Sequence, residues 1–300
     1  MQDVLLPEVT LSILIVNYNG IAYLGPCFES IHKHLTVPYE IILVDNASQD
    51  DSVKYVTLNY PDVILIPSAV NLGFAAGNNL AARSAKGEYL LLLNNDTLLQ
   101  GDLNSVVSLL SFNSSIGALG CKMSGRENEY RYSAGYFPSP IRLLSFSTIF
   151  NRSGPFLTGN FPGGDEIVYD VDWVEGSFIL TRSDLWRSLT GMDENYFMYG
   201  EDIDFCKRVK DSGLRVVYFP SLTFLHYGGY SSSRLGMLVK GFRRFHKKFS
   251  TPSVNLNANF ILTFGLILKT VIYALMSLVQ GRGFGVKSES CLKALKESPW

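Results

Sequence analysis

Polar residues follow directly on the most apolar stretch of the chain. Tyr89-Leu90-Leu91-Leu92-Leu93 leads without a break into Asn94-Asn95-Asp96. A short, unbroken apolar run predicts a strand buried on both faces of a sheet, and open α/β sheets bind ligands beyond the carboxyl ends of their strands. One carboxylate among neutral amides suits a divalent cation that takes other ligands from a substrate's phosphates. The competing interpretation, which these residues leave open, is that Asp96 caps a helix beginning near Leu103.

A second group of carboxylates follows an aromatic loop that ends at Gly200. Glu201 and Asp202 fall in the first turn of a predicted helix that runs to Gly213. Acidic residues are common at a helix start because they interact favourably with its dipole. A carboxylate behind a glycine-hinged loop also suits a general base at the mouth of a cleft. Further along this helix, the spacing predicts that Asp204 and Arg208 form a surface ion pair.

A histidine follows the last predicted strand, Leu214 to Phe219. This residue, His226, stands in the sequence His226-Tyr227-Gly228-Gly229. A lone histidine is more often a structural residue than a ligand, so its position after a strand is the one reason to consider it for a site.

Other predicted strands also end in amides, a carboxylate and an aromatic ring. Such groups can hold a nucleobase by stacking and by hydrogen bonds to its edge. Each residue taken alone is more often a turn former, so both interpretations stay open. The small-residue segment Gly73 to Asn79 allows the backbone to approach a ligand closely. The strand-end candidates are Asn17, Tyr18, Asp45, Asn46 and Asn95.

Strands and helices alternate along the first part of the chain. This order predicts an α/β fold with a doubly wound, mostly parallel sheet. Residues 124–170 lose this periodicity and predict an irregular insert that borders a substrate cleft. The predicted strands are 11–16, 40–44, 63–66, 89–93, 117–121 and 171–180, and the predicted helices between the first four are 22–34, one from about 52, and 75–84.

Several classes of function are disfavoured. The chain has neither a GxGxxG motif after its first strand nor a GxxxxGK[ST] loop, which argues against nicotinamide enzymes and P-loop NTPases. A net charge of −1 over 300 residues gives no nucleic-acid footprint. The four cysteines lack metal-type spacing, and no secretory signal is visible at the amino terminus. We therefore expect a cytoplasmic protein.

The C-terminal part of the chain is more basic and then more apolar than the part before it. The stretch 260–279 is long enough to span a bilayer, and a basic run, 243–248, precedes it. Its polar residues fall on one helical stripe, with Lys269 in the middle, which favours an amphipathic helix over a spanning one. Such a helix would lie on the inner face of the plasma membrane, or dock on the domain or on a sister subunit of a homodimer. The stripe residues are Thr263, Thr270, Tyr273, Ser277 and Gln280.

Six motifs occurring in one order give a family resemblance over residues 10–250. With them the sequence resembles the family 2 glycosyltransferases of GT-A fold, and most of all their rhamnosyltransferase-like branch. The resemblance implies a glycosyltransferase domain over 1–250, with a nucleotide-sugar half (1–122) and an acceptor and catalytic half (123–250), and a helical tail over 251–300. The motifs are Asn17-Tyr18-Asn19, Val44 to Ser48, Asn71 to Phe74, Gly77-Asn78-Asn79, Leu93 to Thr97 and Phe197 to Asp204.

The resemblance also implies roles for individual residues. Asp96 and His226 would bind Mg²⁺ or Mn²⁺, and Asp202, paired with Glu201, would be the catalytic base. Acceptor-site residues would be Trp173 and Gly176. The pyrimidine nucleoside would be held by Asn17, Tyr18, Asp45 and Asn46, with Asn95 beside them. The ribose and diphosphate would be lined by Asn71, Gly73, Gly77 and Asn78.

The expected activity is metal-dependent, inverting hexosyl transfer in bacterial surface polysaccharide synthesis. The donor would be a UDP- or dTDP-sugar such as dTDP-rhamnose, and the acceptor a saccharide or a lipid-linked acceptor. The metal motif reads Asn94-Asn95-Asp96 and lacks the first acid of the family's DXD pattern. The alternatives are a catalytically silent nucleotide-sugar-binding scaffold and a nucleotidyltransferase, although the chain lacks the phosphate loop that the latter would need.

Overall fold

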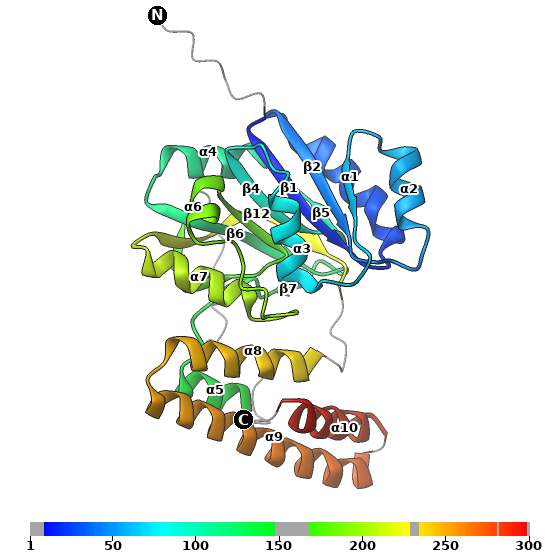
Figure 1. The fold of residues 1–300 in the computed structure, drawn as a ribbon. Helices are drawn as coiled ribbons and strands as arrows, with labels where there is room; N and C mark the ends of the chain where they lie inside the picture. The colour runs from blue at the N-terminus through cyan, green and yellow to red at the C-terminus, as the bar shows by residue number, and fades with distance from the viewer. Residues whose placement is uncertain (1–8, 148–167, 229–233, 281, 299–300) are drawn as a thin grey trace, which may run out of the picture. The chain divides into compact units, whose positions relative to one another are not determined.

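The computed structural model describes residues 9–147, 168–228, 234–280 and 282–298 (Figure 1). They fall into two compact units. The first, here called the sheet unit, comprises 9–134, 168–197 and 201–228. The second, the helical unit, comprises 135–147, 198–200, 234–280 and 282–298. The predicted division of the chain at residues 122 and 250 stays a prediction.

One large sheet forms the centre of the sheet unit. From one edge its strands lie in the order β3 (Ile64–Pro67), β2 (Tyr39–Asp45), β1 (Leu11–Asn17), β4 (Tyr89–Asn94), β11 (Phe178–Arg182), β6 (Ile116–Ser124), β12 (Arg215–His226) and β5 (Thr97–Leu99). The first four are mutually parallel, as are β6 and β12, whereas β11 runs antiparallel to both neighbours. The predicted α/β class with a mostly parallel sheet is confirmed.

Helices connect these strands and flank the sheet (Figure 1). They are α1 (Ile21–His34), α2 (Ser52–Asn59), α3 (Gly73–Ala82), α4 (Asn104–Phe112), α6 (Ser183–Ser188) and α7 (Glu201–Asp211). Two short strands extend the sheet, β7 (Tyr130–Arg131) against β6 and β9 (Tyr169–Val171) against β12. A separate two-stranded sheet consists of β10 (Trp173–Val174) and β8 (Ala134–Gly135).

Two predictions about regular structure were wrong in part. The last strand does not stop at Phe219 but continues to His226, with a register shift against β6 between Phe219 and Thr223. Pro220 lies in that shift, and a proline has no N–H with which to continue the ladder. The supposed irregular insert contains β7, β8 and a helix, α5 (Pro140–Ser147). Its residues 148–167 lie outside the described part of the chain.

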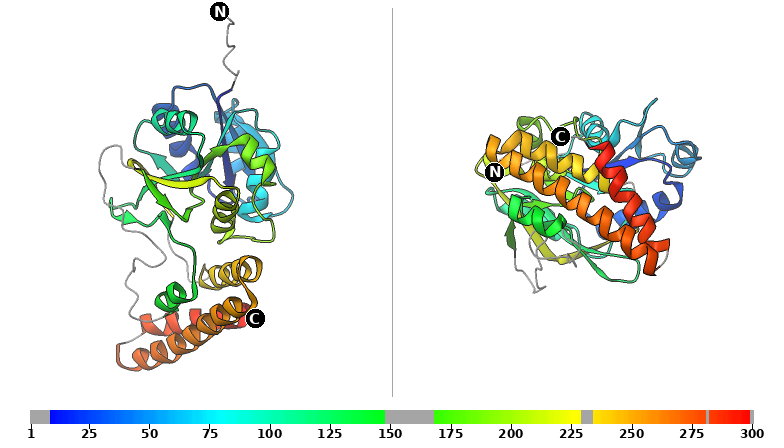
Figure 2. Two further views of the ribbon diagram at one scale, coloured as in Figure 1. Left: turned by 90° about the vertical axis from the view of Figure 1, so that its left-hand side faces the viewer. Right: turned by 90° about the horizontal axis from the view of Figure 1, so that it is seen from below.

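The helical unit consists of α5, α8 (Arg234–Phe249), α9 (Pro252–Gln280) and α10 (Arg282–Glu297). α9 packs against the other three helices (Figure 2). A small core joins α8, α9 and α10 through Val239, Leu266, Cys291 and Ala294. The predicted C-terminal helix is confirmed, although it begins at Pro252 rather than at Phe260.

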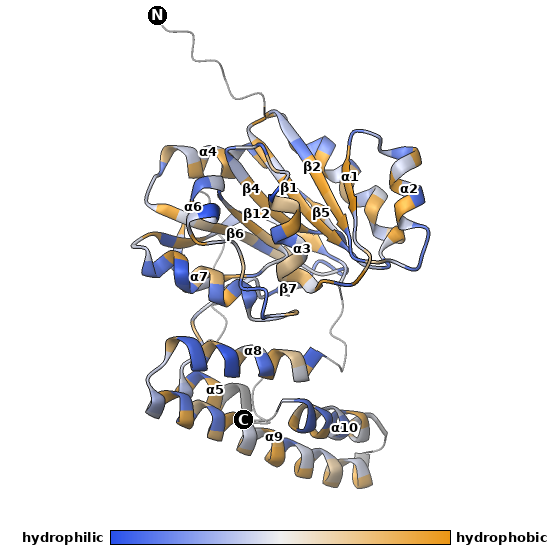
Figure 3. Cartoon of the chain, in the orientation of Figure 1, coloured by the Kyte–Doolittle hydropathy of each residue, from blue (hydrophilic) through white to orange (hydrophobic). Residues whose placement is uncertain are grey.

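α9 is the most apolar helix of this unit (Figure 3). Among the described residues, one helical stretch is long and apolar enough to cross a membrane, namely Pro252–Val279 with a mean hydropathy of 2.0. Only 17% of its most apolar window is buried. Most of this apolar surface is therefore left exposed by the protein itself.

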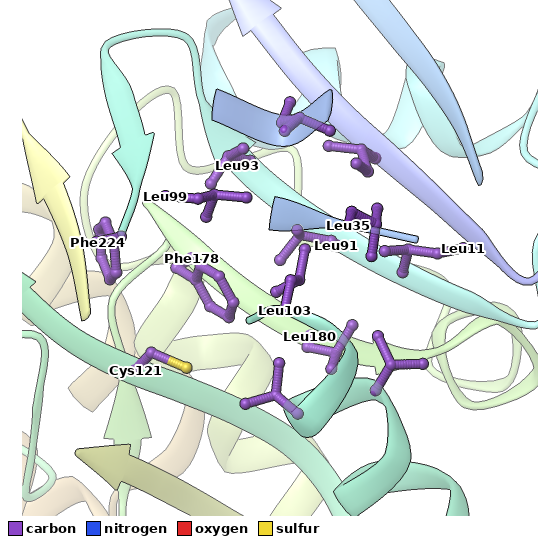
Figure 4. Close-up of a cluster of buried hydrophobic side chains, with 14 of the residues drawn as sticks. Leu11, Leu35, Leu91, Leu93, Leu99, Leu103, Cys121, Phe178, Leu180 and Phe224 are labelled. Carbon is purple, nitrogen blue, oxygen red and sulfur yellow. The ribbon is translucent and has the colours of Figure 1, made fainter. Parts of the chain in front are cut away.

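The core of the sheet unit explains why the strands read as unbroken apolar runs. Leu91 and Leu93 of β4 point into one cluster, together with Phe178 and Phe224 (Figure 4). Their neighbours Leu90 and Leu92 belong to a second cluster. Because successive side chains of a strand point to opposite faces, the alternation shows that β4 is covered on both sides.

The ion pair between Asp204 and Arg208 of α7 was predicted to lie on the surface, and this prediction was wrong. Arg208 Nε donates to Asp204 Oδ1 at 2.6 Å, and the Asp204 side chain has no exposed surface. Arg208 Nη1 also donates to the carbonyl of Leu189 at 2.7 Å. The helix lies closer to the sheet than its polar sequence suggested, so the pair fastens α7 to the loop that follows α6.

We expect Asp204→Ala to lower the free energy of unfolding by about 3–5 kcal/mol, because it leaves the Arg208 guanidinium half-buried without its carboxylate. The matched control is Asp211→Ala on the same helix. Asp211 pairs with Lys207 at the same i,i+4 spacing, but its side chain is 52% exposed. That loss should stay below about 0.5 kcal/mol. Urea denaturation of both variants measures the difference, and equal losses would contradict the buried location.

Candidate active site

Three parallel strands end side by side at one edge of the sheet. β1 ends at Asn17, opposite Asp45 at the end of β2. On the other side of β1, Val16 lies opposite Asn94, the last residue of β4. The structure therefore brings the predicted strand-end residues to a single edge, where the carboxyl ends of parallel strands bind ligands.

A buried hydrogen-bond network ties these ends together. Asn17 Nδ2 donates to Asp45 Oδ2 at 2.9 Å and to Ser48 Oγ at 3.1 Å. Asn17 Oδ1 accepts a hydrogen bond from Asn95 Nδ2 at 2.6 Å. Asn17 and Asp45 are both buried. Their side chains thus fix the relative positions of the loops after β1, β2 and β4.

Gly20 leaves room for this network. A Cβ atom on Gly20 would lie 2.0 Å from Asn95 Nδ2 and 2.5 Å from Asn17 Oδ1, the two atoms that form the shortest bond of the network. Its φ of −114° is accessible to any residue, so the restriction is steric rather than conformational.

Asn46 holds the next loop in place. Its Nδ2 donates to the carbonyl of Gly73 at 3.0 Å, and its Oδ1 accepts from the N–H of Leu72 at 3.2 Å. Asn71 Oδ1 closes the turn by accepting the N–H of Gly73 at 3.0 Å. Gly73 has a φ of +81°, and a Cβ there would lie 2.3 Å from the carbonyl oxygen of Phe197. Only glycine fits this turn.

α3 begins at this turn and carries two further predicted donor residues. A Cβ on Gly77 would already meet both methyl groups of Val16 at 2.9 Å, so this glycine lets α3 lie close against β1. Asn78 is buried and donates to the carbonyl of Phe74 at 3.0 Å, while its Oδ1 accepts no hydrogen bond from the described part of the chain. Tyr18, in contrast, exposes half of its surface and is available for stacking.

Asp96 and His226 meet although 130 residues separate them. Asp96 lies between β4 and β5, and His226, the last residue of β12, lies opposite Thr97. His226 Nε2 is 3.1 Å from Asp96 Oδ1, and the N–H of Tyr227 donates to the carbonyl of Asp96 at 2.9 Å. Asp96 is not the cap of α4, because that helix begins at Asn104.

The charge around His226 is mainly negative. Burial by itself lowers the pKa of His226, but its hydrogen bond with Asp96 and the charges of Asp96 and Glu175 outweigh burial and raise the pKa above its usual value. Glu175 was missed by sequence reasoning. The signal for it was its place between Trp173 and Gly176, both of which were assigned to the site.

These residues fit a divalent cation that takes most of its ligands from a substrate. Among the described residues, no cluster of three or more His, Cys, Asp and Glu side chains could hold a metal by itself. Asp96 and His226 supply two ligand atoms 3.1 Å apart. Adjacent ligands at about 2.1 Å from an octahedral ion are separated by roughly 3.0 Å. A Cβ on Gly228 would lie 2.9 Å from His226 Nε2 and 3.0 Å from Asp96 Oδ2, so this glycine keeps the pair accessible.

Asp202 is oriented by Gly176. Its Oδ2 accepts the N–H of Gly176 at 3.1 Å, and its Oδ1 accepts the N–H of Ile203 at 2.8 Å. The neighbouring Glu201 is only 4% exposed, so Asp202 is the carboxylate of the pair that a substrate can reach. Trp173 is half-buried against the second core cluster.

The turn from Glu175 to Ser177 lies between these groups. Gly176 binds Asp202, Glu175 interacts electrostatically with His226, and the carbonyl of Ser177 accepts the N–H of Asn94 at 3.2 Å. A carboxylate suited to take a proton is thereby linked, through one turn, to a pair suited to hold a cation. Such an arrangement suits the transfer of a group from a diphosphate to a hydroxyl.

We expect Gly20→Ala to lower the free energy of unfolding by about 1–3 kcal/mol, since it breaks the partly buried bond between Asn17 and Asn95. A double-mutant cycle with Asn95→Ala tests this cause, because that variant removes the atom nearest to the new methyl group. The cost of Gly20→Ala should fall in the Asn95→Ala background. An unchanged cost, measured by urea denaturation, would contradict the steric explanation.

Comparisons with known proteins agree with this geometry. The sequence model described as "Glycosyl transferase family 2" matches residues 12–172, more than half of the chain. An N-acetylglucosaminyl-diphospho-decaprenol L-rhamnosyltransferase of Mycobacterium tuberculosis is 27% identical over 244 residues, which cover 75% of this chain and 78% of that protein. The rhamnosyltransferase WbbL of Escherichia coli is 30% identical over 230 residues, covering 72% of this chain and 82% of that protein.

The fold is also found among solved glycosyltransferases. The mannosyltransferase PcManGT of Pyrobaculum calidifontis, solved in complex with GDP-Man and Mn²⁺, superposes with a TM-score of 0.61. The match covers 97% of this chain and 87% of that one at 14% identity, so it shows the fold alone. The GT-A fold implied by the sequence resemblance is thus confirmed. The family match, together with the rhamnosyltransferase relatives, shows that the chain belongs to glycosyl transferase family 2.

Proposed function

We propose that this transferase moves a hexosyl group, rhamnosyl in particular, from a UDP- or dTDP-sugar to a hydroxyl group of a saccharide or lipid-linked acceptor, with inversion. The observation that carries the proposal is the Asp96–His226 pair, 3.1 Å apart beside the strand ends and linked by the 175–177 turn to Asp202. The names of the relatives support it. Two are rhamnosyltransferases, and the mycobacterial one is named for a diphospho-decaprenol acceptor.

The donor would lie along the sheet edge. Tyr18 would stack on the base, and the loops fixed by Asn17, Asp45, Asn46 and Asn95 would present backbone groups to the nucleoside. The turn at Asn71 and Gly73 would bring the backbone close to the ribose and the diphosphate. Because most of these side chains are occupied with one another, their contribution would be to hold the loops in a binding-competent shape rather than to contact the donor directly.

Asp96 and His226 would hold Mg²⁺ or Mn²⁺. When bound, such an ion neutralises the charge that develops on the diphosphate leaving group. PcManGT, of the same fold, was solved with Mn²⁺, which supports this choice of ligand. His226 Nε2 must be unprotonated to act as a ligand, and the other ring nitrogen, Nδ1, lies 3.3 Å from Met123 Sδ, to which its N–H can donate.

Asp202 would accept the proton of the acceptor hydroxyl. The hydroxyl oxygen forms its bond to the anomeric carbon on the face opposite the diphosphate, while the bond between that carbon and the phosphate oxygen breaks. A single displacement of this kind inverts the configuration. The N–H of Gly176 orients Asp202, and any side chain at Gly176 would meet the ring of Phe74 at 2.9 Å.

We expect the melting temperature to rise by about 5 °C in the presence of Mn²⁺ or Mg²⁺ and UDP or dTDP at 100 times their dissociation constant, because ligand binding stabilises the native state. Asp96→Ala and His226→Ala should each abolish the metal-dependent part of this shift. Asp102→Ala, in the same connection between β4 and α4, is the control and should keep it. A shift with NAD alone, or none with any nucleoside diphosphate, would refute the donor assignment.

Asp202→Asn should lower kcat for sugar transfer by a factor of roughly 10² to 10⁴, the usual contribution of a general base. The nucleotide-dependent thermal shift should remain, because the Asn94 to Asp96 segment is untouched. Asp211→Asn on the same helix serves as the control for surface charge. Near-normal turnover by a folded Asp202→Asn variant would exclude it as the base. A wild-type chain that binds nucleotide but transfers no sugar would instead favour the silent scaffold.

A further inference from the structure

α9 presents an apolar stripe to the outside of the helical unit. Nine large apolar side chains, each 38–85% exposed, recur at steps of three or four residues along it. This spacing places them on one face of the helix. The outward stripe of α9 comprises Leu256, Phe260, Phe264, Ile267, Leu268, Val271, Leu275, Leu278 and Val279.

The inward face of α9 makes polar contacts as well as apolar ones. Arg243 of α8 donates to Asn259 Oδ1 at 3.2 Å and to Thr263 Oγ1 at 2.8 Å. On the other half of the helix, Ser288 of α10 donates to the carbonyl of Thr270 at 2.9 Å. An ordinary surface helix of a soluble protein turns its apolar side inward and its polar side to water. α9 buries Leu262 and Leu266 in this way, but it also turns polar groups inward and leaves nine large apolar side chains exposed.

The stripe is long and continuous. Leu256 and Val279 are 23 residues apart, which corresponds to about 34 Å of helix. The rings of Phe260 and Phe264 stack on the surface with centroids 6.0 Å apart. α5 packs beside α9 and adds the exposed side chains of Ile141 and Leu144. Scattered apolar residues need no explanation, but a contiguous surface of this length marks an interaction site.

The charge of the helical unit indicates what binds there. Its described residues carry twelve Lys and Arg against two Asp and Glu, a net charge of +10. The described residues of the sheet unit carry thirteen against twenty-one, a net charge of −8. The overall charge of −1 therefore hides two units of opposite sign. α9 itself contains one charged residue, Lys269, and no carboxylate.

An anionic lipid surface matches both properties. Basic helices with an exposed apolar face bind the boundary between headgroups and acyl chains, where the apolar side enters and the cations remain with the headgroups. A second copy of the chain fits less well, since an isologous contact through this face would bring together two units that each carry +10. A spanning α9 fits less well too, because α8, which packs against it, carries five basic residues, namely Lys240, Arg243, Arg244, Lys247 and Lys248.

We propose that the outward stripe of α9 docks on the surface of an anionic bilayer, with the helix lying in the plane of the membrane. None of the stripe residues belongs to the candidate active site, so this proposal does not depend on the proposed function. If both hold, the docking would keep the enzyme beside membrane-anchored acceptors.

Co-sedimentation of the full-length chain with vesicles tests the docking. The chain should bind vesicles that contain 30% phosphatidylglycerol at least tenfold more tightly than vesicles of phosphatidylcholine alone, and high salt should weaken the binding. Phe264→Asp and Leu275→Asp, about three turns apart from each other on the stripe, should each reduce binding by about tenfold or more. Both side chains are exposed, so neither change should alter the melting temperature.

The matched control is Phe112→Asp. Phe112, at the end of α4 in the sheet unit, is 90% exposed and should be replaceable without loss of vesicle binding. Wild-type chain that does not sediment with anionic vesicles would overturn the proposal. So would binding that Phe264→Asp leaves unchanged. Light scattering measures whether the chain forms dimers in solution. If the wild-type chain is a dimer and the Phe264→Asp variant is a monomer, a second copy of the chain occupies the stripe, and the proposal is overturned.

Discussion

The hydrogen bonds between Asn17, Asp45 and Asn95 are the constraint on which the site depends. Parallel strands that are buried on both faces can present functional residues to solvent only at their ends. The loops that leave those ends diverge unless hydrogen bonds hold them together. A buried amide that donates to a carboxylate and accepts from a second amide links three of these loops at once. Gly20 and Gly73 are glycines because any larger residue would occupy the space that these bonds and turns require.

The rest of the site is assembled around β11, which runs antiparallel to both of its neighbours. Its insertion between β4 and β6 brings the 175–177 turn to the end of β4, so that Gly176 can bind Asp202 while Ser177 accepts from Asn94. β12 continues beyond the register shift at Pro220, and its last residue, His226, therefore lies beside Asp96. The residues proposed to bind a cation are thus positioned by strand pairing, and the proposed proton acceptor by its bond to Gly176. The charge of Glu175 adds to the negative field around His226.

The two units differ in how far they cover their own apolar surface. The sheet unit covers both faces of its strands with its own helices and carries excess negative charge. The helical unit buries polar contacts between α8 and α9, leaves apolar side chains outside and carries excess positive charge. In the docking proposed above, a membrane would supply apolar and anionic surroundings to the helical unit.

The sequence by itself determined the α/β class, the family and most strand positions, because apolar runs of strand length and the residues that end them are local signals. The same signals placed Asn17, Asp45, Asn46 and Asn95 at strand ends, and their meeting follows from parallel pairing. Only the tertiary structure decided that Asp96 faces His226 rather than caps α4, that Asp204 is buried, and that Glu175 adds to the charge around His226. It also decided which side of α9 faces outward. These outcomes depend on residues that are far away in the sequence. The periodicity of apolar residues shows which side chains share a face of a helix or strand, but it does not show which neighbouring element packs against that face.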